Sequence, residues 1–385
     1  MAAHALLSAS SSERWLKCTP SARATEHIKD TTSVYAQEGT LAHELGELEL
    51  RYQLKEIIKT TYNKELKKLQ GDDLYAEDMP EEVEKYTSFV FERFAEAKGH
   101  TTDALVLLEQ KLDFSKYVPK GFGTGDCIII ADNVLEIIDL KYGKGVEVYA
   151  ENNTQMMLYA LGALEAYSFI YDISKVRMSI AQPRLDNFST WEMSVEDLEK
   201  WVIETLVPNA ALAWEGTGDF KAGDWCKWCK IKQNCKARSE FMLEIAESYE
   251  LKDPNLLSVE EIAEILKRAD EIQGWAKDVQ DYALEQARDY NINFPGWKLV
   301  EGRSNRKYTD EGFVHESLIN AGYTEEQILK EPELLGITAM EKLLGKKKFN
   351  SLLQDFIVKP PGKPTLTPDT DKRPELNSVE SDFDL

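Results

Sequence analysis

The chain has 385 residues and a formal net charge of −22 at pH 7, and 43% of its residues are hydrophobic. This length can hold two or three domains, and the apolar content is ample for buried cores. The acidic balance argues against broad, nonspecific binding to nucleic-acid phosphates, because such binding depends on Lys and Arg. No apolar run is long enough for a membrane helix, and residues 1–10 lack the basic start of a signal peptide. We therefore expect a soluble protein of the cytoplasm.

A helix is expected over residues 34–58, downstream of an isolated cysteine, Cys18. His43 and Glu47 are four positions apart, so they share one face of this helix. An imidazole can supply a metal ligand, although a lone helical His is also a common structural residue. A helical insertion is expected next, over about 59–100, with Pro80 at a first helical position and a core stripe of Val83, Tyr86, Val90 and Phe94.

A strand is expected at Leu105–Leu112, and two further apolar runs follow it on either side of Asp132-Asn133. If these two residues form a tight turn, the resulting hairpin places Asp126 directly opposite Asp139. Two facing carboxylates destabilise a sheet unless a cation lies between them, and Mg²⁺ prefers carboxylate and water oxygens. The pattern therefore predicts a divalent-metal site, with a solvated hairpin face as the alternative interpretation.

The alternation of strand side chains predicts which way two residues next to these carboxylates point. Lys141 shares the face of Asp139, while Cys127 should point away from Asp126 as a small buried hydrophobe. Beyond the hairpin, a helix is expected over 153–168, and a strand over 175–180.

The helix over 153–168 carries Gln155 and Tyr159, which are four positions apart and therefore share a face. A Gln amide and a phenol donate or accept hydrogen bonds without adding charge. A capped surface pair is the alternative interpretation.

The cysteines give an independent signal. Cys226, Cys229 and Cys235 follow a C-x₂-C-x₅-C spacing, which is short enough to direct several thiolates at one metal. A cytoplasmic chain would not normally keep these residues as disulfides. Zinc is one possible metal, although a zinc ribbon prefers two C-x₂-C pairs.

The rest of the chain carries weaker signals. Residues 241–357 are expected to form a mainly helical domain, beginning with a capping box at Ser258 and a helix whose apolar stripe should be a packing face. A basic cluster contains Arg303, Arg306 and Lys307, which are weaker candidates for contacts to a nucleic-acid strand and equally suit a solvated loop. Residues 358–385 are Pro-rich and then acidic, and we expect them to be disordered.

Taken in order, these residues resemble the RecB-like branch of the PD-(D/E)xK nuclease superfamily. Its pattern is a helical His, an Asp, a (D/E)-x-K and a Q-x-x-x-Y. These positions are filled here by His43, Asp126, Asp139 with Lys141, and Gln155 with Tyr159. The resemblance covers about residues 1–240 and departs from the family in its long helical insertion. It implies an α/β fold with a restriction-endonuclease-like αβββαβ core, a mixed central sheet and a mainly helical C-terminal region.

The resemblance also implies a cofactor for the cysteines. The triplet together with remote Cys18 looks like the [4Fe–4S] site of the iron–sulfur members, including the CRISPR-associated exonucleases. In that interpretation the cluster joins the N-terminus to the segment after the nuclease core. The domains are then 1–240, 241–357 and the tail 358–385.

The implied activity is a Mg²⁺- or Mn²⁺-dependent deoxyribonuclease, expected to be an exonuclease. His43, Asp126, Asp139 and the Leu140 carbonyl would hold the metal, and Lys141 would orient or deprotonate the attacking water. Gln155 and Tyr159 would position the scissile strand, while Glu47 is a weaker candidate for an outer or second-metal ligand.

The arrangement also looks similar to nuclease-superfamily proteins of phages and prophages, which implies a role in DNA replication or recombination inside a bacterial host. The acidic tail could dock a phage single-strand-annealing or single-strand-binding protein, or only keep the chain in solution. Two other hypotheses stay open: a metal-stapled DNA-binding or assembly module with an inactive site, and a zinc-bound interaction scaffold.

Overall fold

The computed structural model describes residues 5–29, 33–247, 257–300, 310–322, 324–325 and 336–353. The chain divides into two compact units, Met1–Leu299 and Val300–Leu385. The first unit ends later than the boundary expected near residue 240. One reason is Asp278, which lies on the helix Val259–Asp289. Its carboxylate forms ion pairs with Lys232 at 3.2 Å and with Arg238 at 2.7 Å, and these attach the helix to the first unit.

The core of the first unit is a five-stranded sheet in the order β1-β2-β3-β4-β5. The strands are β1 (Leu105–Asp113), β2 (Phe122–Ala131), β3 (Val134–Leu140), β4 (Lys175–Gln182) and β5 (Asn187–Ser194). Neighbours are antiparallel except β3 and β4, which are parallel and connected through α6 (Thr154–Tyr167). The expected α/β class with a mixed central sheet is confirmed, and β5 is an additional strand that the sequence pattern did not predict.

The expected hairpin register is confirmed. Cys127–Ala131 pair antiparallel with Val134–Ile138, and Ala131 lies opposite Val134. Asp132 has a φ of 51°, in the left-handed region that a tight turn requires and that Asp tolerates. Continuing this register brings Asp126 and Asp139 to the same end of the two strands.

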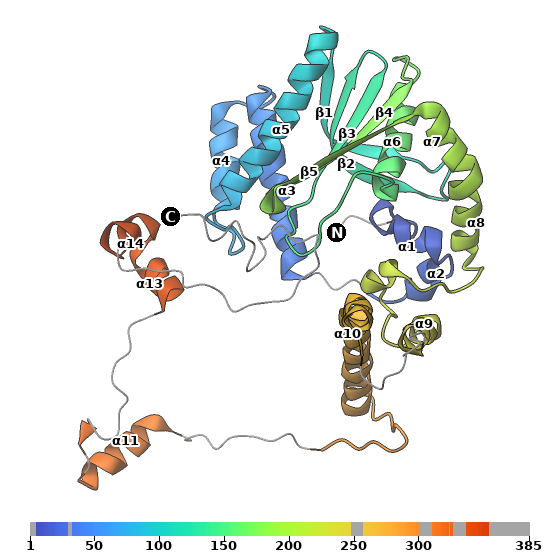
Figure 1. The fold of residues 1–385 in the computed structure, drawn as a ribbon. Helices are drawn as coiled ribbons and strands as arrows, with labels where there is room; N and C mark the ends of the chain where they lie inside the picture. The colour runs from blue at the N-terminus through green and yellow to red at the C-terminus, as the bar shows by residue number, and fades with distance from the viewer. Residues whose placement is uncertain are drawn as a thin grey trace. The chain divides into compact units, whose positions relative to one another are not determined.

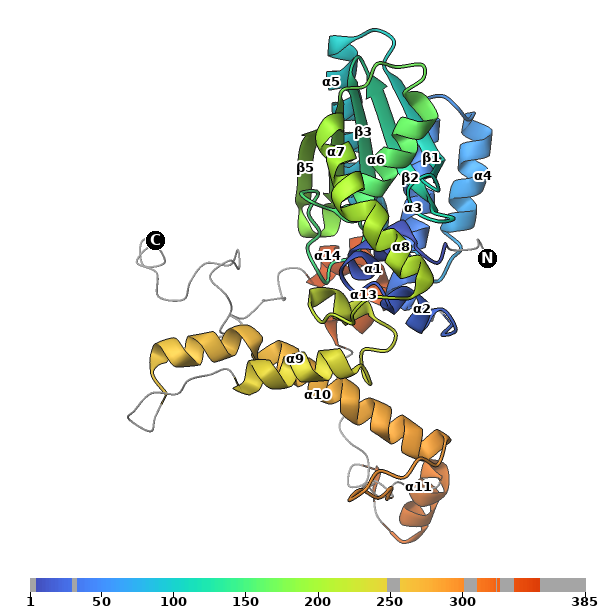
Figure 2. The ribbon, with the colours of Figure 1, turned by 90° about the vertical axis from the view of Figure 1, so that its right-hand side faces the viewer.

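Helices cover both faces of the sheet (Figure 1). One face carries α3 (Val34–Gln53), α4 (Lys59–Leu69) and α5 (Met79–His100); the other carries α6, α7 (Val195–Trp201), the π-helix η3 (Val202–Leu206) and α8 (Val207–Glu215). Figure 2 looks onto this second face. The short N-terminal elements η1 (Ala9–Ser11), α1 (Ser12–Lys17) and α2 (Ser21–Thr25) lie beside α6 and α8, and η2 (Pro183–Leu185) links β4 to β5. The expected helical insertion is therefore the pair α4 and α5.

Alternation along the strands produces two cores. Ile128, Ile130 and Leu135 pack in the cluster under α6, whereas Cys127 and Ile129 pack in the cluster under α5. The expectation that Cys127 is a buried hydrophobe is thus confirmed. Both faces of the central strands are therefore mainly apolar, and a polar side chain buried within the sheet needs its own partners.

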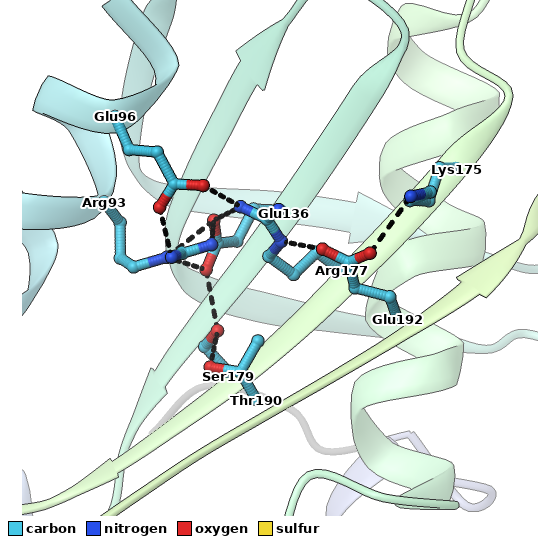
Figure 3. A network of polar contacts seen from close by, with 8 residues as sticks. All are labelled: Arg93, Glu96, Glu136, Lys175, Arg177, Ser179, Thr190 and Glu192. Atoms are coloured by element: carbon cyan, nitrogen blue, oxygen red, sulfur yellow. Dashed lines mark hydrogen bonds and ion pairs between the residues drawn. The ribbon is translucent and has the colours of Figure 1, made fainter. Parts of the chain in front are cut away.

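One such position is Glu136 on β3, which is buried under α5 (Figure 3). Its carboxylate accepts a hydrogen bond from Arg93 Nε of α5 at 2.9 Å and one from Ser179 Oγ of β4 at 2.6 Å. Arg177 of β4 also approaches it, with Nη1 3.4 Å from Oε2, and continues to Glu192 on β5. The network connects α5 with three adjacent strands.

Helix ends follow local chemistry. The helix α3 ends at Gln53 rather than at residue 58, because Lys55 adopts a left-handed φ of 64°. The helix α6 begins as expected, with the Asn153 side chain accepting a hydrogen bond from Met156 N.

After α8 the chain forms the 3₁₀ helix η4 (Asp224–Trp228), α9 (Lys236–Glu247) and α10 (Val259–Asp289). The capping box at Ser258 is confirmed, with Glu261 N donating to Ser258 Oγ and Ser258 N donating to Glu261 Oε2. The expected packing face of α10 is not confirmed, since the helix has no buried residue and Ile262 and Leu266 are exposed.

The second unit contains the described helices α11 (Glu311–Asn320), α13 (Ile337–Leu344) and α14 (Lys346–Leu353). Gly345, with φ at 74°, separates the last two. The candidates Arg303, Arg306 and Lys307, and the tail 358–385, lie outside the described residues. Among the described helices, none combines the length and apolar character that crossing a bilayer requires.

Candidate metal centre

The predicted site residues come from four elements and meet at one end of β2 and β3. The helix α3 supplies His43, β2 supplies Asp126, β3 supplies Asp139, and α6 supplies Gln155 and Tyr159. Lys141 follows the last residue of β3, where its N–H still donates to Ala181 O of β4 at 2.8 Å. This backbone hydrogen bond holds the lysine at the end of the strand.

His43 and Asp126 form the part of the site next to α3. His43 Nδ1 lies 3.2 Å from Asp126 Oδ2, which also accepts a hydrogen bond from Leu140 N at 2.8 Å. Burial opposes the charged form of His43, but the Asp126 carboxylate outweighs it and raises the pKa of His43 to about 9. Burial also opposes ionisation of Asp126, yet His43 and the Leu140 N–H together lower its pKa. In the absence of metal this pair is therefore an imidazolium and a carboxylate.

Asp139 and Lys141 form the part next to α6. Lys141 Nζ lies 2.8 Å from Asp139 Oδ2 and 3.2 Å from Gln155 Oε1. Burial raises the pKa of Asp139, and the Asp126 charge raises it further, against the effect of Lys141. Burial lowers the pKa of Lys141, but Asp139 reverses this and the net shift is upward. The expectation of a lowered lysine pKa concerned a metal-loaded site and stays a prediction.

Gln155 connects Asp139 with Tyr159. Its Nε2 lies 3.4 Å from Asp139 Oδ1 and 3.2 Å from the Tyr159 hydroxyl. A Cβ at Gly123 of β2 would lie 2.6 Å from the Tyr159 ring, so the absence of a side chain there lets the phenol approach the sheet. Burial raises the pKa of Tyr159, so its hydroxyl stays protonated and able to donate.

Glu109 on β1 is a site residue that the sequence analysis missed. The ladder pairs Leu108 with Cys127 and Gln110 with Gly125, which leaves Glu109 facing Asp126. Ligand atoms of Glu109, Asp126 and His43 all lie within 4.8 Å of one another, as a metal site requires. Burial, followed by the charges of Asp126 and Glu47, raises the pKa of Glu109 to about 7.

A break in strand alternation explains why Glu109 was missed. Glu109 has a φ of 50°, in the left-handed region, within an otherwise extended strand. Val106 and Leu108 pack under α5, whereas Leu112, also at an even position, packs under α6. The strand thus changes its buried face at Glu109, and alternation counted from sequence alone does not reveal this. Its only visible signal was a carboxylate within an apolar strand.

The contacts of two other predicted residues leave their expected roles as predictions. Leu140 donates its N–H to Asp126, while a metal contact through its carbonyl stays a prediction. Glu47 pairs with Arg51 at 2.7 Å and stands close enough to raise the pKa of Glu109. A role for Glu47 outside the first ring of ligands is compatible with this position.

The residues present suit a hard divalent cation. Asp139 Oδ2 is buried and accepts no hydrogen bond of good geometry from the described residues, although Lys141 Nζ lies close to it. Buried carboxylate oxygens without such partners are costly, and they are the ligand atoms that Mg²⁺ and Mn²⁺ prefer. Together with the His43, Glu109 and Asp126 triad, the site offers carboxylate and imidazole ligands from three strands and one helix.

The four cysteines of the expected second site influence one another's charge, but their sulfurs do not gather at one point. Cys18 follows α1, and its sulfur accepts from Lys221 N at 3.4 Å. Burial is the largest cause of the raised pKa of Cys226, and the charges of Cys229, Cys235 and Cys18 raise this pKa further. Among the described residues, no three cysteine sulfurs lie within 4.8 Å of one another.

Comparison with known proteins places the chain in a family. A solved structure titled "Crystal structure of SSO0001" matches 59% of this chain and 96% of its own chain, at 17% identity and a TM-score of 0.21. That score is below the level from which a shared fold is inferred. Over residues 4–374 the chain matches the family described as "Protein of unknown function (DUF2800)", and it belongs to that family.

Proposed function

We propose that this protein is a metal-dependent DNA nuclease that hydrolyses phosphodiester bonds, acting as an exonuclease in phage or prophage DNA replication or recombination in the bacterial cytoplasm. The observation that supports the proposal is a chain of contacts from His43 through Asp126 to Leu140 N, and from Asp139 through Lys141 and Gln155 to Tyr159. Structural roles alone give no reason to gather a buried carboxylate, a partly buried carboxylate, a lysine and an imidazole at one end of the sheet.

His43, Glu109, Asp126 and Asp139 would hold Mg²⁺ or Mn²⁺. When bound, the ion would neutralise charge on the phosphodiester and lower the pKa of a coordinated water. His43 occupies the cation position beside Asp126 in the free protein and would give up its proton when it becomes a ligand.

The other residues act through position and hydrogen bonding. Lys141 would orient the attacking water, since its ammonium group is held between Asp139 and Gln155. Gln155 fixes the lysine through its carbonyl oxygen and leaves its amide N–H groups toward Asp139 and Tyr159. The Tyr159 hydroxyl, which stays protonated, would donate to a phosphate oxygen of the scissile strand.

We further propose that Cys18, Cys226, Cys229 and Cys235 hold a [4Fe–4S] cluster. A single tetrahedral zinc with Zn–S bonds of about 2.3 Å would need sulfurs only ~3.8 Å apart. A four-iron cluster places irons between the sulfurs and therefore spaces them more widely than one zinc ion does. Iron and acid-labile sulfide in equal amounts after anaerobic purification support this assignment, whereas zinc alone contradicts it.

The nuclease proposal is tested by incubating the anaerobically purified protein with end-labelled single- and double-stranded DNA and Mg²⁺ or Mn²⁺. Asp139→Asn and Lys141→Ala should abolish release of mononucleotides or short oligomers while leaving the circular-dichroism spectrum unchanged. Matched controls are Asp172→Asn and Lys144→Ala, both exposed and outside the contact chain, and these should cleave like the wild type. Silence from wild type and variants alike, together with DNA binding, would replace the nuclease with a binding or assembly module.

A further inference from the structure

A cavity of about 500 Å³ lies away from the candidate metal centre, between the N-terminal elements and the cysteine segment. Its walls combine serine hydroxyls, Arg14 from α1, and Trp225 and Trp228 from η4. The volume falls in the range of small-molecule sites, and the lining mixes aromatic rings with a few polar groups. Neither the proposed metal centre nor the fold accounts for this composition.

Arg14 is the unusual residue in this wall. Its Nε is buried and has no hydrogen-bond partner among the described residues. Because Nε is enclosed, it does not itself reach a ligand in the cavity. Arg14 presents to a ligand the rest of its half-buried side chain, which lines the cavity. Beside it, the Ser8 and Ser11 hydroxyls lie 2.8 Å apart and hydrogen-bond each other, so the pair uses one of its two protons internally and has one left to donate to a ligand. Arginine and serine donors converging in a cavity are the groups that bind a phosphate oxygen.

The tryptophans supply the second part of a ligand site. Trp228 is 73% exposed although it lines the cavity, and Trp225 is anchored by its Nε1 donating to Lys221 O at 2.9 Å. A large aromatic ring left in water beside a cavity is available for stacking on a planar ligand. Base–aromatic stacking is how proteins hold single strands without reading sequence.

The charge of the lining limits the class of ligand. Glu13 and Glu26 also line the cavity, and Glu26 is paired with Arg23 at 3.0 Å. Arg14 and Lys230, whose Nζ donates to Ile28 O at 2.8 Å, are the cations of the lining and only balance the two carboxylates, so a phosphate would need a neutral, stacking group attached to it. A nucleotide has both parts, whereas inorganic phosphate and a sulfated polymer have only the charge.

We propose that this cavity binds one nucleotide unit of single-stranded DNA, with its phosphate on Arg14 and its base stacked on Trp228. The inference rests on the proposed function for its choice of DNA strand, and it assigns the protein a strand-holding subsite apart from the cleavage site. Cys18 follows the helix that carries Arg14, and Cys226 and Cys229 each directly follow one of the two tryptophans. A metal held by these cysteines would therefore fix the distance between the two walls of the cavity.

The test measures binding without cleavage. Fluorescence anisotropy of a labelled oligothymidylate is titrated with the anaerobically purified full chain in buffer without added divalent ions. Trp228→Ala should weaken binding by about 5- to 100-fold, the effect of losing one base stack, and Trp228→Phe should restore most of it. Arg14→Gln should weaken binding by about tenfold. Thymidine monophosphate should compete, whereas inorganic phosphate and heparin should not.

Matched controls are Trp297→Ala and Arg268→Gln, which change an exposed tryptophan and an exposed arginine elsewhere in the first unit. Cysteine-bound metal is assayed in each variant, so that a damaged cysteine segment is recognised and Arg14→Gln then decides. Unchanged affinity in Arg14→Gln and Trp228→Ala, or competition by phosphate equal to that by the nucleotide, would overturn the proposal. Binding is measured without divalent ions and cleavage with them, on the same wild-type protein, so failure of the nuclease and failure of the cavity are separate results.

Discussion

At the scale of single residues, the two carboxylates of the centre have opposite pKa shifts. Burial is the largest effect on both, but His43 and the Leu140 N–H lower the pKa of Asp126, whereas the pKa of Asp139 is raised. Each carboxylate has its own cation in the free protein, His43 for Asp126 and Lys141 for Asp139. These two cations explain how the two acids can lie near each other without metal. A bound divalent ion would replace His43 as the cation beside Asp126.

Glu109 gives the first residue-scale prediction. Glu109→Gln keeps the size of the side chain but removes the charge next to Asp126 and His43, so Mn²⁺ affinity should fall by about 10- to 100-fold. Titration of Mn²⁺ by electron paramagnetic resonance measures this. The control Glu92→Gln changes an exposed glutamate of α5 and should bind Mn²⁺ like the wild type. Equal affinity in both variants would remove Glu109 from the site.

The pH dependence of metal binding gives the second. His43, with a pKa of about 9, must lose its proton to become a ligand, and Glu109, with a pKa of about 7, adds a second proton below neutrality. Protonated forms predominate below each pKa, so metal binding weakens as pH falls. Mn²⁺ affinity should therefore rise about tenfold per pH unit between about pH 7 and pH 8.5, where only His43 still titrates.

The same titration on His43→Gln serves as the comparison. That variant should bind Mn²⁺ more weakly and lose most of the rise above neutral pH. A wild-type affinity that stays constant across this range would show that His43 does not compete as an imidazolium.

At the scale of elements, the sheet holds its helices by different means on its two faces. The face under α6 is covered by apolar side chains, whereas α5 is also fastened to β3 and β4 by the Glu136 network (Figure 3). The apolar sequence of β3 hides a carboxylate that would be costly without these partners. Two arginines and a serine hydroxyl satisfy it.

Removing Glu136 should therefore destabilise the sheet. Glu136→Ala leaves Arg93 and Arg177 without their buried partner, and we expect the free energy of unfolding to fall by about 3 kcal/mol. Glu192→Ala, at the more exposed end of the same network, should cost at most about 1 kcal/mol. Urea unfolding followed by circular dichroism measures both, and equal losses would contradict a special role for the buried carboxylate.

At the scale of the whole molecule, the cysteines connect the beginning of the chain to a segment that follows the sheet. Cys18 and Lys221, which share a hydrogen bond, are 203 positions apart in the chain. A metal on these cysteines would close a very long loop and fix the walls of the Arg14 and Trp228 cavity. The strongly acidic surface makes such fixed, local sites more important, since a charge of −22 gives little general attraction to DNA.

Loss of this metal gives the whole-molecule prediction. Cys226→Ser should lower the content of cysteine-bound metal and weaken oligothymidylate binding about tenfold or more, because the Trp228 wall is no longer held against α1. Mn²⁺ affinity at His43 and Asp126 should not change. The control Cys127→Ala removes a buried cysteine under α5 and should keep both the metal and the oligomer binding. A metal-free Cys226→Ser protein that binds the oligomer normally would separate the cavity from the cysteines.

Local patterns were enough to predict much of the fold. The hairpin register followed from the Asp132-Asn133 turn, the start of α6 from Asn153, and α5 from the stripe behind Pro80. Predictions failed where a distant contact decides the outcome. Strand β5 has a mixed polar pattern and forms by pairing with β4, and α10 has an apolar stripe but no buried residue.

The sequence by itself determined the hairpin register and most of the helices and strands, because each depends on periodicity and turn chemistry within a short stretch of chain. The six motif residues were selected by resemblance to a nuclease family, and their roles stay predictions. Only the tertiary structure decided that Glu109 faces Asp126, that Glu136 is paired under α5, and that Arg14 and Trp228 line one cavity. These facts depend on a change of strand face and on contacts between segments far apart in the chain. No local pattern encodes them.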